Sequence, residues 1–461
     1  MTESTAADPS PIPLTFGQDH ELPLAMRTEP PPNAIQVAVR IEGQLDADLL
    51  AQALRHVTAD NDGLRMRLLD GTISRAAAAG QVTLPVPAVD SPDRPLLVRQ
   101  LVKARDEDQF GLYVRRLRAV NKSRQWDLVQ GPPYAFRLLR LTADHHAFLG
   151  DFSRFVLDGR GRVLFLTRLW DAYSALACGR KPAPTGAPDA FTRAARQQRA
   201  TMDRRSATVN HRYWQGKFTA LGERLAAAGG LTEVGTPRSV MAATTVARTR
   251  SLRFRGRTLA ELRAAHERAG ASLFQWVLAA AAVEVFRRWP DPVLPISVQV
   301  DTRDSDAMAI VGRFSVKLPL HLTRADDVPA MLRVIKAELL HALRHRHISE
   351  AHLRGARDAA VAEAAPSARA ALQAVAHRRA LTARLMDHDG GLVLQAAGLR
   401  LDSAAYPPAA DYRHDGVDIS VHQNAERVVV ALALDSSEFT DRDADDFAAG
   451  VEAHLRQPVS V

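Results

Sequence analysis

Two stretches of the chain alternate between strand-like and helix-like hydrophobic patterns, and a segment rich in proline and glycine separates them. In the first stretch, residues 34–42 alternate apolar and polar side chains, and residues 45–57 carry apolar residues on one helical face. After the separating segment, residues 179–190, the same kind of pattern returns, with a strand predicted over 247–254. Helices and sheets bury their apolar faces against one another. The pattern therefore predicts an α+β protein with two lobes, divided at residues 1–182 and 183–461.

The remaining elements complete each lobe. Residues 1–33 are proline-rich and are predicted to be extended, and residues 189–223 are predicted to form one long basic helix. Thr440 is the predicted N-cap of a final helix that ends at 456. Further helices are expected over 160–179, 257–269 and 272–289, and strands over 64–70, 134–142, 146–156, 293–300, 312–322, 391–402, 416–422 and 427–434.

Composition narrows the protein class. The single cysteine, Cys178, excludes an intramolecular disulfide framework and a cysteine-based metal cluster. The longest apolar run, 273–286, contains Glu284 and is too short for a membrane span, and no signal-peptide region is recognisable at residues 1–13. We therefore expect a cytoplasmic protein that does not bind a membrane.

The net charge of +8, from 60 basic and 52 acidic residues, is spread along the chain. No zinc-finger, helix-turn-helix or RNA-binding motif accompanies it. The positive charge is therefore better explained by a compositional bias toward arginine and alanine than by nucleic-acid binding.

Several segments, in order along the chain, resemble the condensation domains of nonribosomal peptide synthetases and their stand-alone relatives. Gln18 occupies the last position of a segment similar to the Ser-x-x-Gln opening of that family, and Leu64-Arg65 is similar to its Leu-Arg-x-x-Phe strand. Arg303 lies on a strand that matches one carrying a structural arginine in the family. Six segments match in the same order as in the family, which makes chance an insufficient explanation. They are residues 13–24, 43–68, 156–184, 272–289, 298–305 and 310–322.

The resemblance implies a fold and a set of partners. It implies two chloramphenicol-acetyltransferase-like lobes, arranged as a V-shaped pseudo-dimer with a central tunnel. The substrate would be an acyl thioester on the phosphopantetheine arm of an acyl or peptidyl carrier protein, and the nucleophile a small amine or alcohol. No bound cofactor and no metal are expected. We expect His20, Asp151 and Phe314 to line the tunnel.

The family motif is His-His-x-x-x-Asp-Gly, and its second histidine assists acyl transfer. Asp158-Gly159 is the better anchor for it, because a helix pattern follows directly. In this register Ser153 and Arg154 occupy the two histidine positions. The adjacent pair His145-His146 has the wrong spacing to Asp151 and is not followed by Asp-Gly.

Arginine at the second motif position changes the chemistry that the site can perform. Because arginine stays protonated in proteins, Arg154 cannot act as a general base. Three roles are open to it: stabilising an oxyanion, pinning a carboxylate or phosphate, or forming an internal ion pair, for instance with Asp151, in a retired site. The resemblance implies that Asp158 pairs with Arg303 and that Gly159 permits the exit into the following helix.

Other candidate residues are weighed against ordinary structural roles. His20, His345, His347, His414 and His422 are each expected to be surface or hydrogen-bonded core histidines rather than displaced bases. The His341–His345 spacing fits a metal-binding helix face, but a solvated face explains it more simply. Helix 193–212 is basic and is equally compatible with an acidic carrier protein and with solvent.

Two functions follow from the resemblance. The first is an atypical acyltransferase, with Arg154 and Ser153 at its site, that forms an amide, an ester or a ring on a carrier-bound chain in secondary metabolism. The second is an inactive docking module that recruits a tailoring enzyme or a carrier protein. The alternative to both functions is a silent paralogue, which would perform neither of them. If Phe152, Phe155 or Trp276 plugged the tunnel, docking would be favoured.

Overall fold

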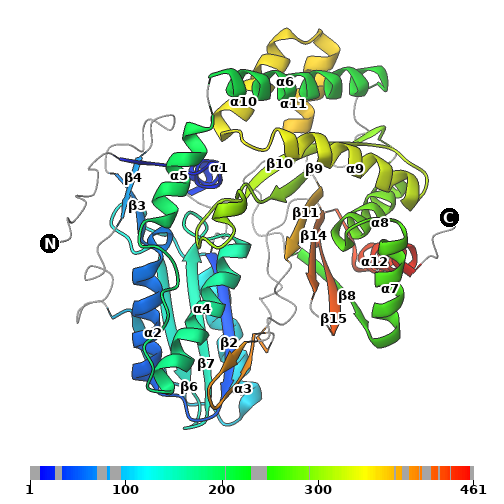
Figure 1. The fold of residues 1–461 in the computed structure, drawn as a ribbon. Helices are drawn as coiled ribbons and strands as arrows, with labels where there is room; N and C mark the ends of the chain where they lie inside the picture. The colour runs from blue at the N-terminus through cyan, green and yellow to red at the C-terminus, as the bar shows by residue number, and fades with distance from the viewer. Residues whose placement is uncertain are drawn as a thin grey trace.

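The computed structural model contains two six-stranded mixed β-sheets that stand side by side, each covered by helices (Figure 1). This is the predicted α+β architecture, with one large hydrophobic core for each sheet. The structure describes residues 11–25, 34–69, 80–83, 95–202, 204–229, 247–289, 291–377, 381–386, 394–403, 405–406, 417–423, 426–436 and 438–456.

The first sheet has the strand order β12-β13-β2-β7-β6-β5. One face packs on helices α2 (Ala47–Asp60) and α4 (Gly159–Ala177), and the other face packs on α3 (Glu107–Lys122). Alternation along β7 explains both contacts: Phe148 and Phe152 lie in the core beneath α4, whereas Ala147 and Leu149 lie with residues of α3. The strands are β2 (Ala34–Glu42), β5 (Leu97–Leu101), β6 (Tyr134–Arg140), β7 (His145–Ser153), β12 (Gln395–Ala396) and β13 (Leu399–Asp402).

The second sheet has the strand order β10-β9-β11-β14-β15-β8. Helix α8 (Leu273–Arg288) is its central cover and is buried along nearly its whole length, which matches the apolar run in the sequence. The strands are β8 (Ala247–Arg255), β9 (Val293–Val300), β10 (Val316–Thr323), β11 (Leu381–Met386), β14 (Val417–Gln423) and β15 (Arg427–Asp435), and the flanking helices are α7 (Gly256–Arg268), α9 (Val328–Arg344) and α12 (Asp441–Arg456).

Helix caps predicted from the sequence form as expected. The Asp46 carboxylate accepts hydrogen bonds from the backbone N–H groups of Asp48 and Leu49 at the start of α2. Thr440 accepts one from Asp443 at the start of α12, and the Asp443 side chain bonds back to Thr440. Both helices therefore begin where their capping residues predict.

Three segments differ from the sequence prediction. The opening is not extended throughout, because residues Phe16–Ala25 form helix α1, which packs on β10 and α10 (Glu350–Glu363). The predicted helix 189–223 is two helices, α5 (Ala190–Ala200) and α6 (Arg204–Ala227). The predicted strand 64–70 is the 3₁₀ turn η1 (Asp62–Arg65) followed by the short strand β3 (Met66–Leu68), which belongs to a small third sheet with β1 (Ile12–Pro13) and β4 (Gly80–Thr83).

The start of α5 depends on a residue far away in the chain. The carboxylate of Asp62 accepts hydrogen bonds from the backbone N–H groups of Phe191 and Thr192, both at 2.9 Å. These N–H groups lie in the first turn of α5 and have no partner within the helix. Asp62 therefore fixes the segment after residue 190 against the first lobe.

The two halves of the chain interleave rather than follow each other as separate blocks. The strand predicted over 391–402 lies partly outside the described residues, and its described part, β12 and β13, extends the first sheet through β2. Val311 and Phe314 also lie in the core of the first lobe, and Phe16 lies in that of the second. Helix α11 (Pro366–His377), helices α9 and α10 and strand β11 were not predicted; α6, α10 and α11 group together at one end of the molecule (Figure 1).

Within the described part of the chain, no single helix is both long and apolar enough to cross a membrane. The pair α7 and α8 passes the same test only jointly, and it is bent by 91°.

Candidate functional site

The segment between β7 and α4 carries the motif positions. Strand β7 ends at Ser153, a turn follows, and Asp158 caps α4 by accepting a hydrogen bond from the backbone N–H of Gly161 at 2.8 Å. This geometry fits the register that anchors the motif at Asp158, because strand, turn and capped helix follow in the expected order. It places Ser153 at the end of the strand and Arg154 at the start of the turn.

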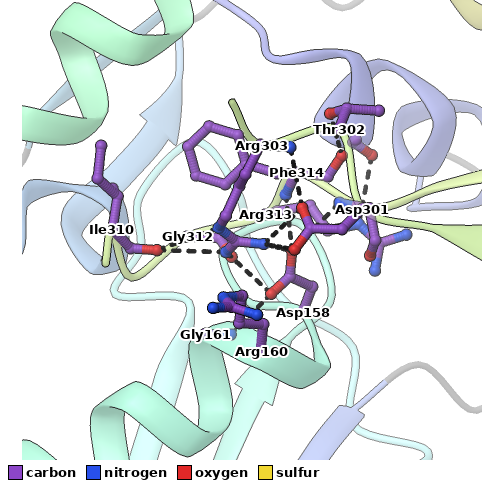
Figure 2. A network of polar contacts seen from close by, with 12 residues as sticks. Asp158, Arg160, Gly161, Asp301, Thr302, Arg303, Ile310, Gly312, Arg313 and Phe314 are labelled. Carbon is purple, nitrogen blue, oxygen red and sulfur yellow. Dashed lines mark hydrogen bonds and ion pairs between the residues drawn. The ribbon is translucent and has the colours of Figure 1, made fainter. Parts of the chain in front are cut away.

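Asp158 and Arg303 form a buried bidentate ion pair between the two halves of the chain (Figure 2). The two Arg303 Nη atoms donate to the two carboxylate oxygens at 2.8 and 3.0 Å, and both side chains are almost fully buried. Burial alone would raise the pKa of Asp158, but the charge and hydrogen bonds of Arg303 lower it below its usual value. The structure therefore brings together the two residues that the sequence pairs.

Further contacts satisfy both members of the pair. Asp158 also accepts the backbone N–H groups of Phe314 and Ser315 at 2.9 and 3.1 Å. Arg303 donates to the carbonyls of Ile310 and Gly312, and its guanidinium lies 4.4 Å from the centre of the Phe314 ring (Figure 2). Phe314, which we expected along a tunnel, is fully buried and supports this ion pair.

The glycine that matters for close packing is Gly161 rather than Gly159. A Cβ on Gly159 would meet nothing within 4 Å, and its backbone does not lie in the left-handed region. A Cβ on Gly161 would lie 2.9 Å from the carbonyl oxygen of Gly312 and 2.9 Å from Leu157 Cδ1. The tight approach of α4 to the second half of the chain therefore requires glycine two residues later than expected.

Ser153 is engaged in local structure. Its side chain is almost fully buried, and its Oγ accepts a hydrogen bond from the backbone N–H of Phe155 at 3.2 Å. Its backbone is bonded on both sides, to Pro133 and Val156. The oxygen thus stabilises the turn into the motif.

Arg154 faces Glu21 rather than the suggested partner Asp151. Its Nε lies 3.5 Å from Glu21 Oε1, and the same oxygen accepts a hydrogen bond from Arg313 Nη2 at 2.6 Å. Glu21 comes from α1 and Arg313 from the loop before β10. These three residues, Glu21, Arg154 and Arg313, form what we call the Arg154 cluster.

The carboxylate in the Arg154 cluster is a very weak base. Burial would raise the pKa of Glu21, but the positive charges of Arg313, Arg154 and Lys317 lower it to about 2. Glu21 and Arg313 are 3% and 1% exposed, whereas the Arg154 side chain is 20% exposed. The cluster therefore holds a permanently ionised acid between two arginines, and only Arg154 reaches solvent appreciably.

Asp151 lies apart from the Arg154 cluster. It sits on β7, where its two carboxylate oxygens accept hydrogen bonds from Gln36 at 2.8 Å and Asn121 at 2.7 Å. Burial raises its pKa above the ordinary value. Asp151 therefore belongs to a polar network beneath α3. These contacts do not indicate the position along a tunnel that we expected for it.

The candidate histidines are engaged in ordinary contacts. His20 binds Glu350 at 3.0 Å and the carbonyl of Ile348 at 3.2 Å, and so joins α1 to α10. His345 bonds Asn210 at 2.8 Å and stacks on Tyr213. His347 stacks on Phe16. His414 lies outside the described residues.

His422 shares one face of β14 with Ser420, 3.1 Å away. Burial and the charge of Arg162 lower the pKa of His422 to about 4. Among the residues that the structure describes, no group of three or more histidine, cysteine, aspartate or glutamate side chains is placed to hold a metal ion.

The bulky residues weighed as plugs belong to the two cores. Phe152 and Phe155 lie in the core of the first lobe, and Trp276 lies in that of the second. A cavity of about 390 Å³ lies between α4, α5 and the loop 304–311, and Phe314 lines part of it. Neither Ser153 nor Arg154 lines this cavity, so it is distinct from the motif positions.

Sequence signals could not have identified the partners of Arg154. Glu21 and Arg313 each lie in segments that match the family, but neither occupies a motif position. A charged residue in a short helix or in a loop is normally solvated. Only the approach of α1 and the loop before β10 buries both charges.

Comparisons with known proteins agree with this fold. The Condensation domain family model matches residues 26–359. Two component proteins of the linear gramicidin synthase from Brevibacillus parabrevis are each 26% identical to this chain, one over 282 residues and the other over 227 residues. These matches cover 61% and 47% of this chain but only 5% and 3% of the two much longer synthase proteins.

Solved structures give similar matches over nearly the whole chain. The X-domain from teicoplanin biosynthesis superposes with a TM-score of 0.72 at 20% identity, covering 98% of this chain and 97% of that one. The first condensation domain of the calcium-dependent antibiotic synthetase, in complex with a substrate analogue, gives 0.73 at 20% identity, covering 98% of each. The complex of the X-domain with OxyB gives 0.71 at 20% identity, covering 98% of this chain and 94% of that one. With the family model matching most of its length, this chain belongs to the condensation-domain family, whose chloramphenicol-acetyltransferase-like fold it has.

Proposed function

We propose that this chain is a docking module of the condensation-domain type in nonribosomal peptide biosynthesis. It holds a chain tethered to the phosphopantetheine arm of a carrier protein and presents that chain to a tailoring enzyme, without transferring the acyl group. The observation that carries the proposal is the Arg154 cluster. Its only carboxylate has a pKa of about 2, and arginine occupies the position at which the family has a histidine base.

Two further observations support this proposal. The Ser153 Oγ caps a turn, which leaves it poorly placed as a nucleophile. The fold also resembles the X-domain from teicoplanin biosynthesis, which has been solved in complex with OxyB. That likeness concerns the fold, and the tailoring enzyme is part of the proposal for this chain.

An atypical acyltransferase is the second candidate, and the 20% exposure of the Arg154 side chain favours it. A fixed cation there would stabilise the oxyanion of a tetrahedral intermediate. An amine attacks a thioester without an obligatory enzyme base, so positioning alone would supply much of the rate. The intact Asp158–Arg303 pair is compatible with both candidates.

One experiment separates the two candidates. The acyl-loaded carrier protein is incubated with this protein and a panel of amines and alcohols, and the mixture is divided between size-exclusion chromatography and intact-mass analysis. The docking proposal expects co-elution with an unchanged carrier mass. Protein-dependent loss of the acyl group would overturn it and favour the acyltransferase, and absence of any complex would also count against docking.

A further inference from the structure

The cavity between α4, α5 and the loop 304–311 plays no part in the docking proposal. It measures about 390 Å³, a size that small-molecule sites in proteins commonly have. Asp60, Asn61, Asp62 and helix α4 line it from the first half of the chain, and α5, the loop and Phe314 line it from the second half. A ligand in this cavity would therefore touch both halves of the chain.

Much of the cavity wall is apolar. Ala190 lines it together with four buried residues, Ala194, Ala307, Val311 and Phe314. Protein interiors are normally closely packed, and the small alanine side chains leave open a space that larger ones would fill. This wall suits the hydrocarbon body of a ligand, because apolar surface leaves water when such a body binds.

The buried polar residues of the wall are already bonded within the protein. Asp62 accepts the backbone N–H groups at the start of α5, and Asn61 accepts a hydrogen bond from Arg168 at 2.6 Å. Gln198 donates a hydrogen bond to the Thr302 hydroxyl at 3.1 Å. These groups therefore shape the wall and need no ligand to satisfy them.

The arginines of the wall are matched by carboxylates. Asp60 stabilises the protonated form of Arg168, and Arg193 forms an ion pair with Asp189. The carboxylate of Asp62 lies at the start of α5, where the helix dipole favours negative charge. These groups therefore give the cavity little net preference for an ion.

Two further carboxylates, Asp304 and Asp306, line the cavity and are accessible to solvent. Asp304 lies 3.6 Å from Arg346 and 4.0 Å from His347, and both separations are too long for good hydrogen bonds. Asp306 accepts a hydrogen bond from Ser305 at 3.1 Å, and it forms no ion pair with any residue that the structure describes. Its negative charge thus complements a ligand that carries one positive charge.

We propose that this cavity binds a small primary amine, with the hydrocarbon body against the apolar wall and the ammonium group at Asp306. The apolar wall selects the body, and the carboxylate selects the charge and accepts a charge-assisted hydrogen bond. Asp304 offers a second acceptor to the same ammonium group. Neither motif position lines the cavity, so the amine site is independent of the docking proposal.

Three probes with the same six-carbon chain test the proposal by calorimetric titration at pH 7. They are hexylamine, which is protonated, hexanol, which is neutral, and hexanoate, which is negatively charged. We expect hexylamine to bind about threefold to fivefold more tightly than hexanol, the range of an accessible ion pair, and hexanoate to bind most weakly. Equal affinities of hexylamine and hexanol, a preference for hexanoate, or no binding of any probe would overturn the proposal.

A substitution at the carboxylate assigns the preference to Asp306. Asp306→Asn should bring the affinity for hexylamine down to that for hexanol and leave the affinity for hexanol unchanged. Asp446→Asn, at a side chain that is 75% exposed on α12, is the matched control and should keep the preference. A preference for hexylamine that persists in Asp306→Asn would contradict the proposed position of the ammonium group.

Filling the cavity tests the apolar wall. Ala194→Leu should weaken the binding of both hexylamine and hexanol, whereas Ala337→Leu, at an exposed position on α9, should not. Unchanged binding in a cooperatively melting Ala194→Leu variant would show that the probes bind elsewhere. If that variant does not fold, a photoreactive diazirine analogue of hexylamine decides the question on the wild-type protein: labels within 186–198 or 304–314 support the site, and labels confined to other segments contradict it.

Discussion

At the residue scale, the proposed motif register puts Arg154 at the position of the family's histidine, and so puts a group that stays charged at every physiological pH in place of one that titrates near neutrality. The structure surrounds this fixed charge with others rather than with apolar side chains. Arg154 meets Glu21, Glu21 meets Arg313, and Asp158 beside them meets Arg303. Both carboxylates are buried and paired. Glu21 is an ion-pair partner of the buried Arg313, and removing Asp158 would leave Arg303 facing Asp301, whose side chain is 33% exposed.

Asp158→Asn tests the buried pair. The substitution removes the more deeply buried of the two carboxylates that pair with Arg303 while keeping the shape, and we expect a loss of about 3 to 5 kcal/mol in the free energy of unfolding. Chemical denaturation measures it. Asp446→Asn, at an exposed side chain on α12 whose ion pair with Arg442 spans 3.9 Å, is the control and should change stability by less than about 0.5 kcal/mol. Similar effects of the two substitutions would refute a stabilising role for the Asp158–Arg303 pair.

The depressed pKa of Glu21 predicts how stability depends on pH. Because its pKa falls from 4.5 to about 2 on folding, its contribution is complete above about pH 5 and is lost as the pH falls through that interval. Glu21→Gln should therefore destabilise the protein most at neutral pH, by roughly 3 kcal/mol, and progressively less toward pH 2. Unfolding curves of the two proteins at several pH values give this difference, and a difference independent of pH would argue against an ionised, paired Glu21.

At the scale of elements, the sequence predicts those parts of the fold whose signals are local. The cap residues Asp46 and Thr440 set the starts of α2 and α12, and alternation sets β2. The break between α5 and α6 and the burial of α1 depend on contacts with distant segments. A local sequence pattern therefore predicts neither feature. The same division holds for the site: Arg154, Asp158 and Arg303 follow from the motif, whereas Glu21 and Arg313 follow only from packing.

Two glycines on the first turn of α4 offer a matched test of that packing. Gly161→Ala should destabilise the protein by about 1 to 3 kcal/mol, because the new Cβ would lie 2.9 Å from the carbonyl oxygen of Gly312. Gly159→Ala meets open space and should be neutral or stabilising by up to about 1 kcal/mol. Thermal melting of both variants distinguishes them, and the reverse order would show that α4 does not approach the 312 carbonyl as described.

At the scale of the whole molecule, the two lobes exchange segments. Strands β12 and β13 from the second half extend the first sheet, and Val311 and Phe314 enter its core. Asp62 and Asp158 in the first half bind backbone and side-chain groups of the second half. These contacts hold the motif segment against both lobes at once.

Cleavage of the chain between the lobes tests this interleaving. A specific protease site placed at Arg180–Lys181, which are exposed, would cut the chain without touching either core. We expect the two fragments to elute together in size-exclusion chromatography, because exchanged segments link them, and to separate only in denaturant. Fragments that elute apart under native conditions would mean that the lobes are independent.

The central claim, that this member of the condensation-domain family binds a tethered chain without transferring it, is tested most directly by the intact mass of an acyl-loaded carrier protein. The carrier is followed over time with an amine acceptor, in the presence and absence of equimolar protein. The account predicts equal rates of acyl loss in both samples. A faster loss with the protein present, abolished in Arg154→Met and accompanied by the matching amide, would contradict it and assign Arg154 to catalysis.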